Sequence, residues 1–313
     1  MGTGSIRASG EAAPNSVPRV SVIIPVRNSA AALKTCLAAL EAQSFPRRDF
    51  EIIVVDNGST DDIASVRSGF PDVIWLEDPG TGSYSARNRG LRRAAGSVVA
   101  FTDADCIPDA AWLSEGLSVL AGKGATIVGG EVPWLDPEGR GLNAYEILET
   151  IMFALGSIRQ LIDERGFAIT ANLLAYREVF DRVGGFDAAL KSAGDREWVL
   201  RAVARGEVLK YAGGAIVRHP RRSTRRDFLR KQRRLVGGRM QLLRRSRPSL
   251  RAVLADLRKV SLLDPRVYKV AFGDPRATGV RRRLNLIGVL LLVSLVTTAE
   301  KLRIICGGEP ARG

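Results

Sequence analysis

The sequence predicts an α/β fold with a mostly parallel sheet, and two observations carry this prediction. Short apolar runs of strand length alternate along the first hundred residues with stretches whose apolar residues recur at helical spacing. The run within residues 97–102 (SVVAFT) is nearly continuous, as expected of a strand buried on both faces of a parallel sheet. Such alternation is typical of βαβ units joined by right-handed crossovers.

The first elements follow one another in regular order. Strands are expected at residues 20–25, 51–55, 73–76 and 97–102. Helices are expected at residues 30–43, shortly after the polar turn 56–61, and at residues 83–95. No G-x-G-x-x-G follows the first strand and no G-K-[ST] occurs, so neither a dinucleotide fingerprint nor a P-loop is predicted.

The second half is expected to complete the same domain. Further strands are expected at residues 126–132, 167–175, 207–211 and 215–217. Helical stretches are expected at residues 145–163, 177–183 and 199–205, the last entered through residues 192–198. We therefore divide the chain into a disordered leader at 1–19, an α/β domain at 20–220, a basic helical region at 221–283, and a hydrophobic membrane-associated segment with tail at 284–313.

Charge is distributed unevenly along the chain. The net charge is +14, yet residues 218–283 contain 22 Lys and Arg against 4 Asp and Glu, which leaves −4 for the remainder. A basic region of this strength favours a polyanionic partner, either an anionic membrane face or nucleic acid. The three cysteines are far apart and show neither metal-ligand spacing nor a disulfide framework, which is typical of a reducing compartment.

Two carboxylates follow the fourth expected strand, one residue apart. Asp103 and Asp105 fall where ligands of open α/β sheets bind, outside the carboxyl ends of the strands. Carboxylate oxygens suit Mg²⁺ or Mn²⁺, ions that usually bind one or two carboxylates together with substrate phosphates. A pair of turn-forming residues after a strand would give the same pattern.

Five motifs in order resemble an inverting family 2 glycosyltransferase of the GT-A fold, of bacterial cell-envelope type. They are VSVIIP at 20–25 followed by Asn28, VDNGSTD at 55–61, ARNRG at 86–90, DAD at 103–105 and GGFD at 184–187. The resemblance covers roughly residues 20–219. It implies transfer of one sugar from a nucleotide-diphosphate sugar, with UDP, GDP or dTDP as the nucleotide, to a hydroxyl of a lipid-linked or envelope glycan acceptor.

The resemblance also implies which residues bind the donor. Asp56 would accept a hydrogen bond from the nucleotide base, and Pro25 and Arg27 would line the same pocket. Arg87, with Asn88 beside it, would contact the diphosphate or the base edge through its fork of donors. The structural alternatives are a turn or cap role for Asp56 and a solvated surface charge for Arg27 or Arg87.

The metal site follows from the same resemblance. Asp103 and Asp105 would hold the ribose and a Mn²⁺ or Mg²⁺ ion, with Asp105 the more direct ligand. His219 is the only histidine in the chain and stands where many GT-A enzymes place a further metal ligand. A structural or surface histidine is the alternative. The ion would act as a Lewis acid on the departing diphosphate.

The acceptor hydroxyl needs a general base as the anomeric carbon becomes oxocarbenium-like. In the family this base is the Asp of a Glu-Asp pair, and here the pair reads Gly194-Asp195. Asp195 is therefore the expected base, with Glu197 as the substitute. The missing Glu leaves open how Asp195 is oriented. A helix start with Asp195 as the cap and Glu197 in the first turn is the structural alternative.

The C-terminal third is expected to contact a membrane. Residues 218–247 place apolar residues between arginines, as in a basic amphipathic helix on a membrane surface. Residues 284–299 carry no charge over 16 residues, which is borderline for a span of roughly 17–25 residues. Spanning, re-entrant, interfacial, and buried or dimerising placements remain open. The basic flank favours the cytoplasmic face of the cell membrane.

Other function classes fit the sequence less well. Residues 232–236 read QRRLV rather than the Q-x-x-R-W of processive family members, which argues for transfer of a single sugar. A sugar-phosphate nucleotidyltransferase would need a Gly-rich basic loop after the first strand, and none is present. A non-catalytic polyanion-binding or membrane-binding protein would leave the Asp motifs unexplained. No nucleic-acid partner is expected because the tail lacks evenly interleaved aromatic residues, and no oligomeric state is predicted.

Overall fold

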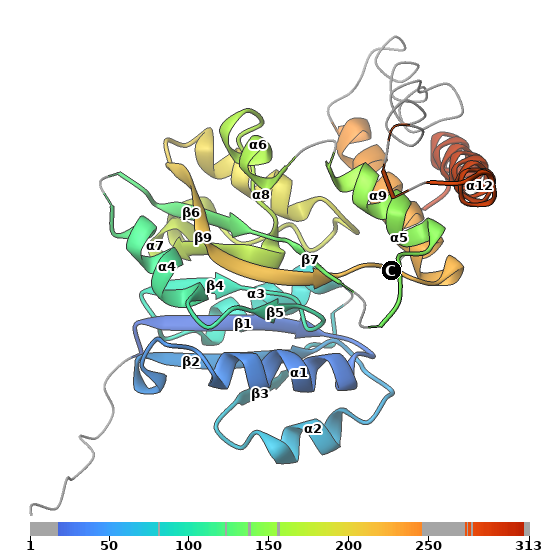
Figure 1. Ribbon diagram of the computed structural model, residues 1–313. Coiled ribbons are helices and arrows are strands. Elements are labelled where there is room, and N and C mark those ends of the chain that lie inside the picture. The colour runs from blue at the N-terminus through green and yellow to red at the C-terminus, as the bar shows by residue number, and fades with distance from the viewer. Residues whose placement is uncertain are drawn as a thin grey trace, which may run out of the picture.

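The computed structural model describes residues 18–80, 82–122, 124–136, 139–154, 157–245, 273, 275–276 and 278–309. Most of the predicted leader at 1–19, and residues 246–272 of the predicted basic region, lie outside the described residues. The described chain forms a central sheet covered by helices on both faces, with a group of three helices beside one end of the sheet (Figure 1).

The sheet is mixed and mostly parallel, as predicted. Its parallel half has the order β3-β2-β1-β4, with β1 at Val20–Val26, β2 at Phe50–Asp56, β3 at Ile74–Glu77 and β4 at Val98–Phe101. Its other half continues through β8 (Leu173–Tyr176), β6 (Ile127–Glu131) and β9 (Leu209–Pro220), with β5 (Ile107–Pro108) and β7 (Trp134–Leu135) paired to β9. β8 is antiparallel to both β4 and β6, whereas β9 is parallel to β6.

Successive residues of each strand face opposite sides of the sheet, so the core is divided into two layers. Along β1, Val22 and Ile24 pack with Leu33 of α1 on one face, whereas Ile23 joins the cluster on the other face. On that second face, α3 approaches closely because Gly90 has no side chain: a Cβ there would lie 2.5 Å from Ile23 Cγ2. The helices around the sheet are α1 (Ala30–Glu41), α2 (Ile63–Gly69), α3 (Ser83–Arg93), α4 (Trp112–Leu120), α6 (Ile158–Asp163), α7 (Arg177–Val183) and α8 (Gly194–Val203).

Several predicted elements differ from the structure; the helix expected at 199–205, for example, already begins at Gly194. The expected strand 167–175 begins only at Leu173, because 170–172 form a tight 3₁₀ turn whose Asn172 side chain donates to the carbonyls of Glu131 and Ala215. The expected strands 207–211 and 215–217 are one strand, β9, which passes through Gly213 and Gly214. The expected helix 145–163 is two helices, and Ser157 starts the second with a capping box.

The helical group consists of α5 (Ala144–Ala154), α9 (Arg225–Arg245) and α12 (Val280–Ile305). Its shared apolar cluster contains Ile147, Leu148, Ile151, Phe228, Leu286, Val289, Leu290 and Val293. In the described part of the chain, α12 is the one helix long and apolar enough to cross a membrane. A single helix of this kind is weak evidence for a span, and 44% of its most apolar stretch is buried against the rest of the protein.

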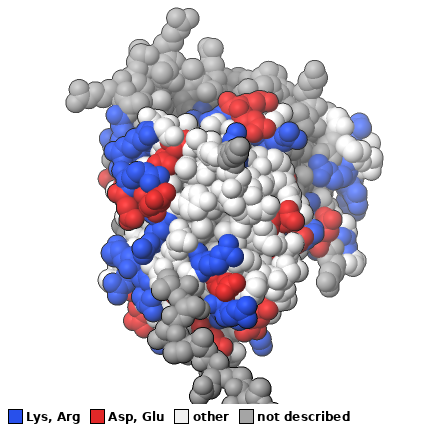
Figure 2. All heavy atoms as spheres, turned by 90° about the vertical axis from the view of Figure 1, so that its left-hand side faces the viewer, with Lys and Arg blue, Asp and Glu red and all other residues white. Residues whose placement is uncertain are grey.

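The face of the molecule turned away from this helical group has no dominant sign of charge. Figure 2 shows Lys and Arg beside Asp and Glu on that face, around a broad uncharged area.

Candidate functional site

The candidate site lies at the edge where the parallel strands end. β1 ends at Val26, β2 at Asp56 and β4 at Phe101, so the loops that follow these strands meet at one edge of the sheet. After β4 the chain turns tightly, because the backbone N–H of Cys106 donates to the carbonyl of Asp103 at 3.0 Å. This turn presents both carboxylates of the DAD motif at the sheet edge.

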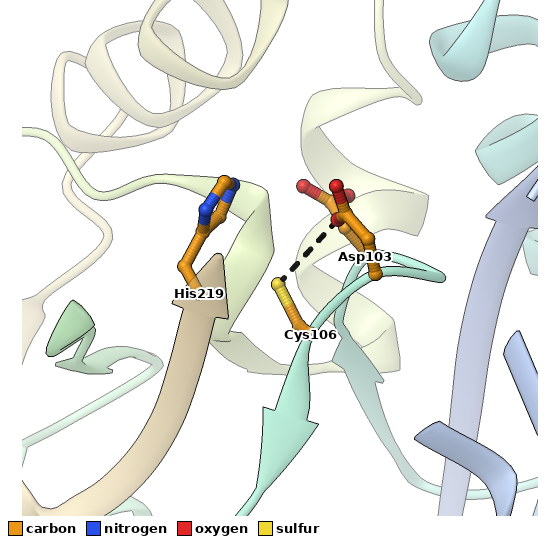
Figure 3. Close-up of side chains that lie close together, drawn as sticks. Asp103, Cys106 and His219 are labelled. Carbon is orange, nitrogen blue, oxygen red and sulfur yellow. Dashed lines mark hydrogen bonds between the residues drawn. The ribbon is translucent and has the colours of Figure 1, made fainter. Parts of the chain in front are cut away.

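The structure brings Asp103, Asp105 and His219 together. One ligand atom from each of them, and the sulfur of Cys106, all lie within 4.8 Å of one another. Figure 3 shows Asp103 after β4 and His219 near the end of β9 pointing to the same side, with the Cys106 thiol between them. β9 reaches this point because it continues to Pro220, where it pairs with β7.

The imidazole of His219 is held in an orientation suited to metal binding. Its Nδ1 lies 2.7 Å from the carbonyl of Pro220, and its ring meets Trp134 edge-on at 5.7 Å between centroids. A proton on Nδ1 would satisfy that carbonyl and leave Nε2 as a free ligand atom. Burial lowers the pKa of His219, and the nearby Lys231 ammonium lowers it further, so the neutral imidazole is favoured.

The chemistry of this cluster fits a hard divalent cation. Two carboxylates and an imidazole are ligands that Mn²⁺ accepts readily, and carboxylates also suit Mg²⁺. Cys106 is not part of such a set. Burial, together with the charges of Asp103 and Asp105, raises the pKa of its thiol well above the ordinary value, so the sulfur stays protonated.

Basic groups from α9 and from the segment before it influence the same carboxylates. The guanidinium of Arg222 pairs with Asp105 at 2.8 Å. Burial alone would raise the pKa of Asp105, but its interactions with His219 and with the guanidinium of Arg222 outweigh this effect and hold that pKa below its usual value. Lys231 binds Glu149 of α5 at 2.6 Å, and the same carboxylate accepts the backbone N–H of Arg222. The sequence analysis did not single out Arg222, Lys231 or Glu149, because nothing in their spacing points to Asp105.

Arg87 is a buried site residue rather than a surface charge. Its side chain is 4% exposed, its Nη2 lies 2.5 Å from Asp103 Oδ1, and its guanidinium lies over the ring of Tyr84. Among the described residues its Nε is one of two buried side-chain polar atoms without a hydrogen-bond partner. A buried donor left unsatisfied is costly, so the guanidinium of Arg87 is stabilised mainly by its ion pair with Asp103 and by the Tyr84 ring.

Asp195 lies at the start of α8 but does not cap it. The N-cap is Ala193, in a left-handed conformation with φ of 61° and no side-chain cap bond. Asp195 Oδ1 accepts from the N–H of Arg196 at 2.8 Å, and Oδ2 accepts from the N–H of Thr170 at 3.4 Å. Burial raises the pKa of Asp195, while Arg87 lowers it and Asp103 raises it, so the carboxylate shares the electrostatic field of the cluster.

Glu197 and Asn88 stabilise the Gly-Gly-Phe-Asp turn. Glu197 pairs with Arg201 at 2.8 Å, and Arg201 donates to the carbonyl of Gly185. Both ends of the Asn88 amide bind the backbone of Phe186, at 2.9 Å and 2.7 Å. Glu197 lies two residues from Asp195 on the helix, so the two side chains face different directions. The structure therefore does not bring Glu197 or the Asn88 amide into the carboxylate cluster.

The strand ends of β1 and β2 form the other side of the site. Pro25 of β1 lies opposite Val55 in the sheet register, and Asp56 follows at the end of β2. Asp56 Oδ1 accepts from the N–H of Ser59 at 2.9 Å, as a turn residue does, and the side chain remains partly exposed. Arg27 is exposed just beyond the end of β1.

A buried amide missed by the sequence analysis organises the next loop. The side chain of Asn57 donates to Asp78 and to the carbonyl of Gly80, and accepts from the N–H of Gly82 at 2.9 Å. Gly82 is the N-cap of α3, with φ of 104°. Asn57 thus fixes the entry to the helix that carries Arg87.

Sequence comparisons relate the chain to known enzymes. Residues 21–186 match the profile described as Glycosyl transferase family 2. The chain is 37% identical over 246 residues to glycosyltransferase AglE of Haloferax volcanii, an alignment that covers 77% of this chain and 79% of that protein. It is 28% identical over 219 residues to the pre-mycofactocin glycosyltransferase of Mycobacterium tuberculosis, covering 67% of this chain and 44% of that protein.

Comparisons of structure agree on the fold. The mannosyltransferase PcManGT of Pyrobaculum calidifontis, solved with GDP-Man and Mn²⁺, superposes with a TM-score of 0.60 at 19% identity and covers 93% of this chain and 88% of its own. TarS 1–349 of S. aureus, solved with UDP-GlcNAc, superposes with a TM-score of 0.52 at 16% identity, covering 93% and 92%. At these identities the likeness shows the fold alone.

Proposed function

The chain belongs to glycosyltransferase family 2, and from this premise we propose that it is an inverting, metal-dependent enzyme that transfers one sugar to a hydroxyl acceptor. The donor is a nucleotide-diphosphate sugar. The observation that carries the proposal is the meeting of Asp103, Asp105 and His219, with ligand atoms within 4.8 Å, beside the guanidinium groups of Arg87 and Arg222. Carboxylates for a cation and guanidiniums for phosphates are the groups that a metal-bound diphosphate requires.

The donor would lie along the edge of the sheet. Pro25, Arg27 and Asp56 would line the pocket for the nucleotide base, and the guanidinium of Arg87, which pairs with Asp103, would contact the phosphates or the ribose. PcManGT was solved with GDP-Man and TarS with UDP-GlcNAc, which supports a nucleotide-sugar donor for this fold.

The residues around the diphosphate would neutralise the charge that develops as the glycosidic bond breaks. Asp103, Asp105 and His219 would hold Mn²⁺ or Mg²⁺, which supplies Lewis-acid stabilisation of the leaving group when bound. Arg222 pairs with Asp105 and would turn its guanidinium to a bound phosphate.

Asp195 is the proposed general base. Its carboxylate would accept the proton of the acceptor hydroxyl as that oxygen attacks the anomeric carbon from the face opposite the diphosphate. Burial raises its pKa toward the range in which a carboxylate is an effective base. Glu197 is engaged with Arg201, so no base role is proposed for it.

The acceptor is proposed to be lipid-linked or an envelope glycan, reached from the cytoplasmic face of an anionic membrane. The exposed side of α12 carries Leu284, Leu291, Leu295 and Leu302, spaced along one face of the helix. Gly288 lies on the same stripe, and a Cβ there would meet no atom within 4 Å. The opposite side of α12 packs on α5 and α9. A helix with one face held by protein and one apolar face exposed is suited to lying in the membrane interface.

Donor hydrolysis tests the function without knowledge of the acceptor. We expect slow Mn²⁺-dependent release of nucleoside diphosphate from at least one member of a panel of UDP-GlcNAc, GDP-Man and dTDP-glucose. Release should stop on chelation of the metal and return when Mn²⁺ is restored. Binding of nucleic acid without affinity for any of the three donors would instead support the polyanion-binding alternative.

A further inference from the structure

Tyr84 packs against the first residue of α8 where only a hydrogen fits. Tyr84 lies in the first turn of α3 and is 5% exposed. A Cβ added to Gly194 would lie 2.7 Å from Tyr84 Cε2 and 2.8 Å from Cζ, distances that real Cβ atoms essentially never show. The ring therefore occupies the space that any side chain at position 194 would need.

The hydroxyl of Tyr84 links the backbone of α8 to Asp195. It accepts from the N–H of Gly194 at 2.8 Å and donates to Asp195 Oδ1 at 3.4 Å. Because the Gly194 N–H occupies one lone pair of the hydroxyl, its own proton is directed to the carboxylate. Burial raises the pKa of Tyr84 well above its usual value, so the hydroxyl stays a donor.

We propose that Tyr84 is a positioning residue for Asp195, and that glycine is required at position 194 to admit its ring. The proposal rests on the proposed role of Asp195 as the base. Oδ1 of Asp195 also accepts the backbone N–H of Arg196, and Oδ2 accepts that of Thr170, so Tyr84 adds a side-chain donor from another helix to Oδ1. The ring also contacts the Arg87 guanidinium, 5.5 Å from its centroid, and so ties the base to the residue that binds Asp103.

The first test is Tyr84→Phe, which keeps the ring and removes the hydroxyl. The substrate is the donor among UDP-GlcNAc, GDP-Man and dTDP-glucose that the wild-type protein hydrolyses in the presence of Mn²⁺. For this donor we expect kcat to fall about tenfold and KM to stay unchanged, because one hydrogen bond to a charged group is lost. The acid limb of the kcat–pH profile should move to higher pH, since an ionised carboxylate that loses a donor binds its proton more tightly.

Tyr211→Phe is the matched control. The Tyr211 hydroxyl donates to a carboxylate as well, that of Glu131 at 2.6 Å, but outside the site. This variant should leave kcat and the pH profile unchanged. A purely structural role for Tyr84 would lower the melting temperature without moving the acid limb. If the Tyr84→Phe variant is folded and both its kcat and the acid limb of its kcat–pH profile are unchanged, the proposal is overturned.

Gly194→Ala and Asp195→Asn complete the experiment. Gly194→Ala should lower kcat at least as much as Tyr84→Phe, because the added Cβ displaces the whole ring, and normal turnover in this variant would also contradict the proposal. Asp195→Asn distinguishes a failure of Asp195 as the base from a failure of Tyr84 as its positioning residue. If Asp195→Asn keeps full turnover, the base assignment fails. If it is inactive while Tyr84→Phe and Gly194→Ala are normal, only the role of Tyr84 fails.

Discussion

The guanidinium of Arg222 lies 2.8 Å from the carboxylate of Asp105, so an arginine already balances one of the proposed metal ligands. Asp105 follows β4 in the middle of the α/β domain and Arg222 follows β9, which brings the two together by carrying the chain to the edge where β4 ends. A divalent cation at Asp105 would compete with this arginine, and a diphosphate bound to that cation would give the arginine a new partner. The ion pair therefore links donor binding to the segment that begins α9.

Removal of Asp105 should abolish the metal site. We expect Asp105→Asn to weaken Mn²⁺ binding by at least about 100-fold, because a charged ligand oxygen is replaced by a neutral one and Arg222 is left unpaired. Calorimetric titration with MnCl₂ measures the change. Asp187→Asn removes another arginine-paired carboxylate far along the chain and serves as the control. Equal Mn²⁺ affinity in both variants would count against the site.

Removal of the Arg222 guanidinium should weaken binding of diphosphates selectively. For Arg222→Gln we expect the Kd for UDP or GDP in Mn²⁺ to rise about tenfold or more, since a charge-assisted hydrogen bond is lost. The Kd for the corresponding monophosphate should change far less. Arg222→Lys should recover only part of the affinity, because an ammonium lacks the planar fork. Equal losses for both nucleotides would place Arg222 away from the second phosphate.

Activity should depend on pH through Asp195. The base works only when ionised, so kcat should fall as the pH drops through its pKa. Because burial raises that pKa, with Arg87 opposing and Asp103 reinforcing the shift, the loss should occur at higher pH than for an ordinary aspartate. Asp195→Asn should lower kcat by about 10² to 10⁴ and preserve nucleotide affinity. A kcat that stays constant down to pH 4 would be inconsistent with this base.

Charge placed on the exposed stripe of α12 should release the protein from membranes. We expect Leu291→Glu with Leu295→Glu to reduce sedimentation with vesicles of anionic phospholipid, because each change puts a carboxylate against the lipid. Val208→Glu alters an exposed apolar residue of the α/β domain and is the control. Unchanged sedimentation of the double variant would show that the stripe does not face lipid.

Much of the fold could be predicted because, in the first half of the chain, the different sequence signals indicate the same strands and helices. Apolar runs, polar turns and helical periodicity agree there, and β1 to β4 formed close to the expected bounds. The predicted and observed elements agree less well where contacts between distant residues determine the backbone conformation. Residues 170–172 leave the extended conformation to satisfy the Asn172 amide, and β9 continues through two glycines because its neighbours pair with it. The break before α6 was visible in principle, since Ser157 and Gln160 have capping-box spacing.

The carboxylates of the candidate site could be predicted from the sequence, but the side chains that pair with them could not. The strand-end position of Asp103 and Asp105 follows from the alternation of strands and helices, whereas the pairing with Arg87 and Arg222 depends on how distant segments pack. The glycine at position 194 left the orientation of Asp195 open in the sequence, and its explanation lies in a tyrosine from another helix. Spacing along the chain contains no signal for such a contact.

The most direct test is a crystal structure of the protein with Mn²⁺ and UDP or GDP, with the metal located by its anomalous scattering. We predict a single manganese peak among Asp103, Asp105 and His219, close to both phosphates, with the nucleotide base beside Asp56. A nucleotide bound in another cleft, with no manganese at these three residues, would contradict it.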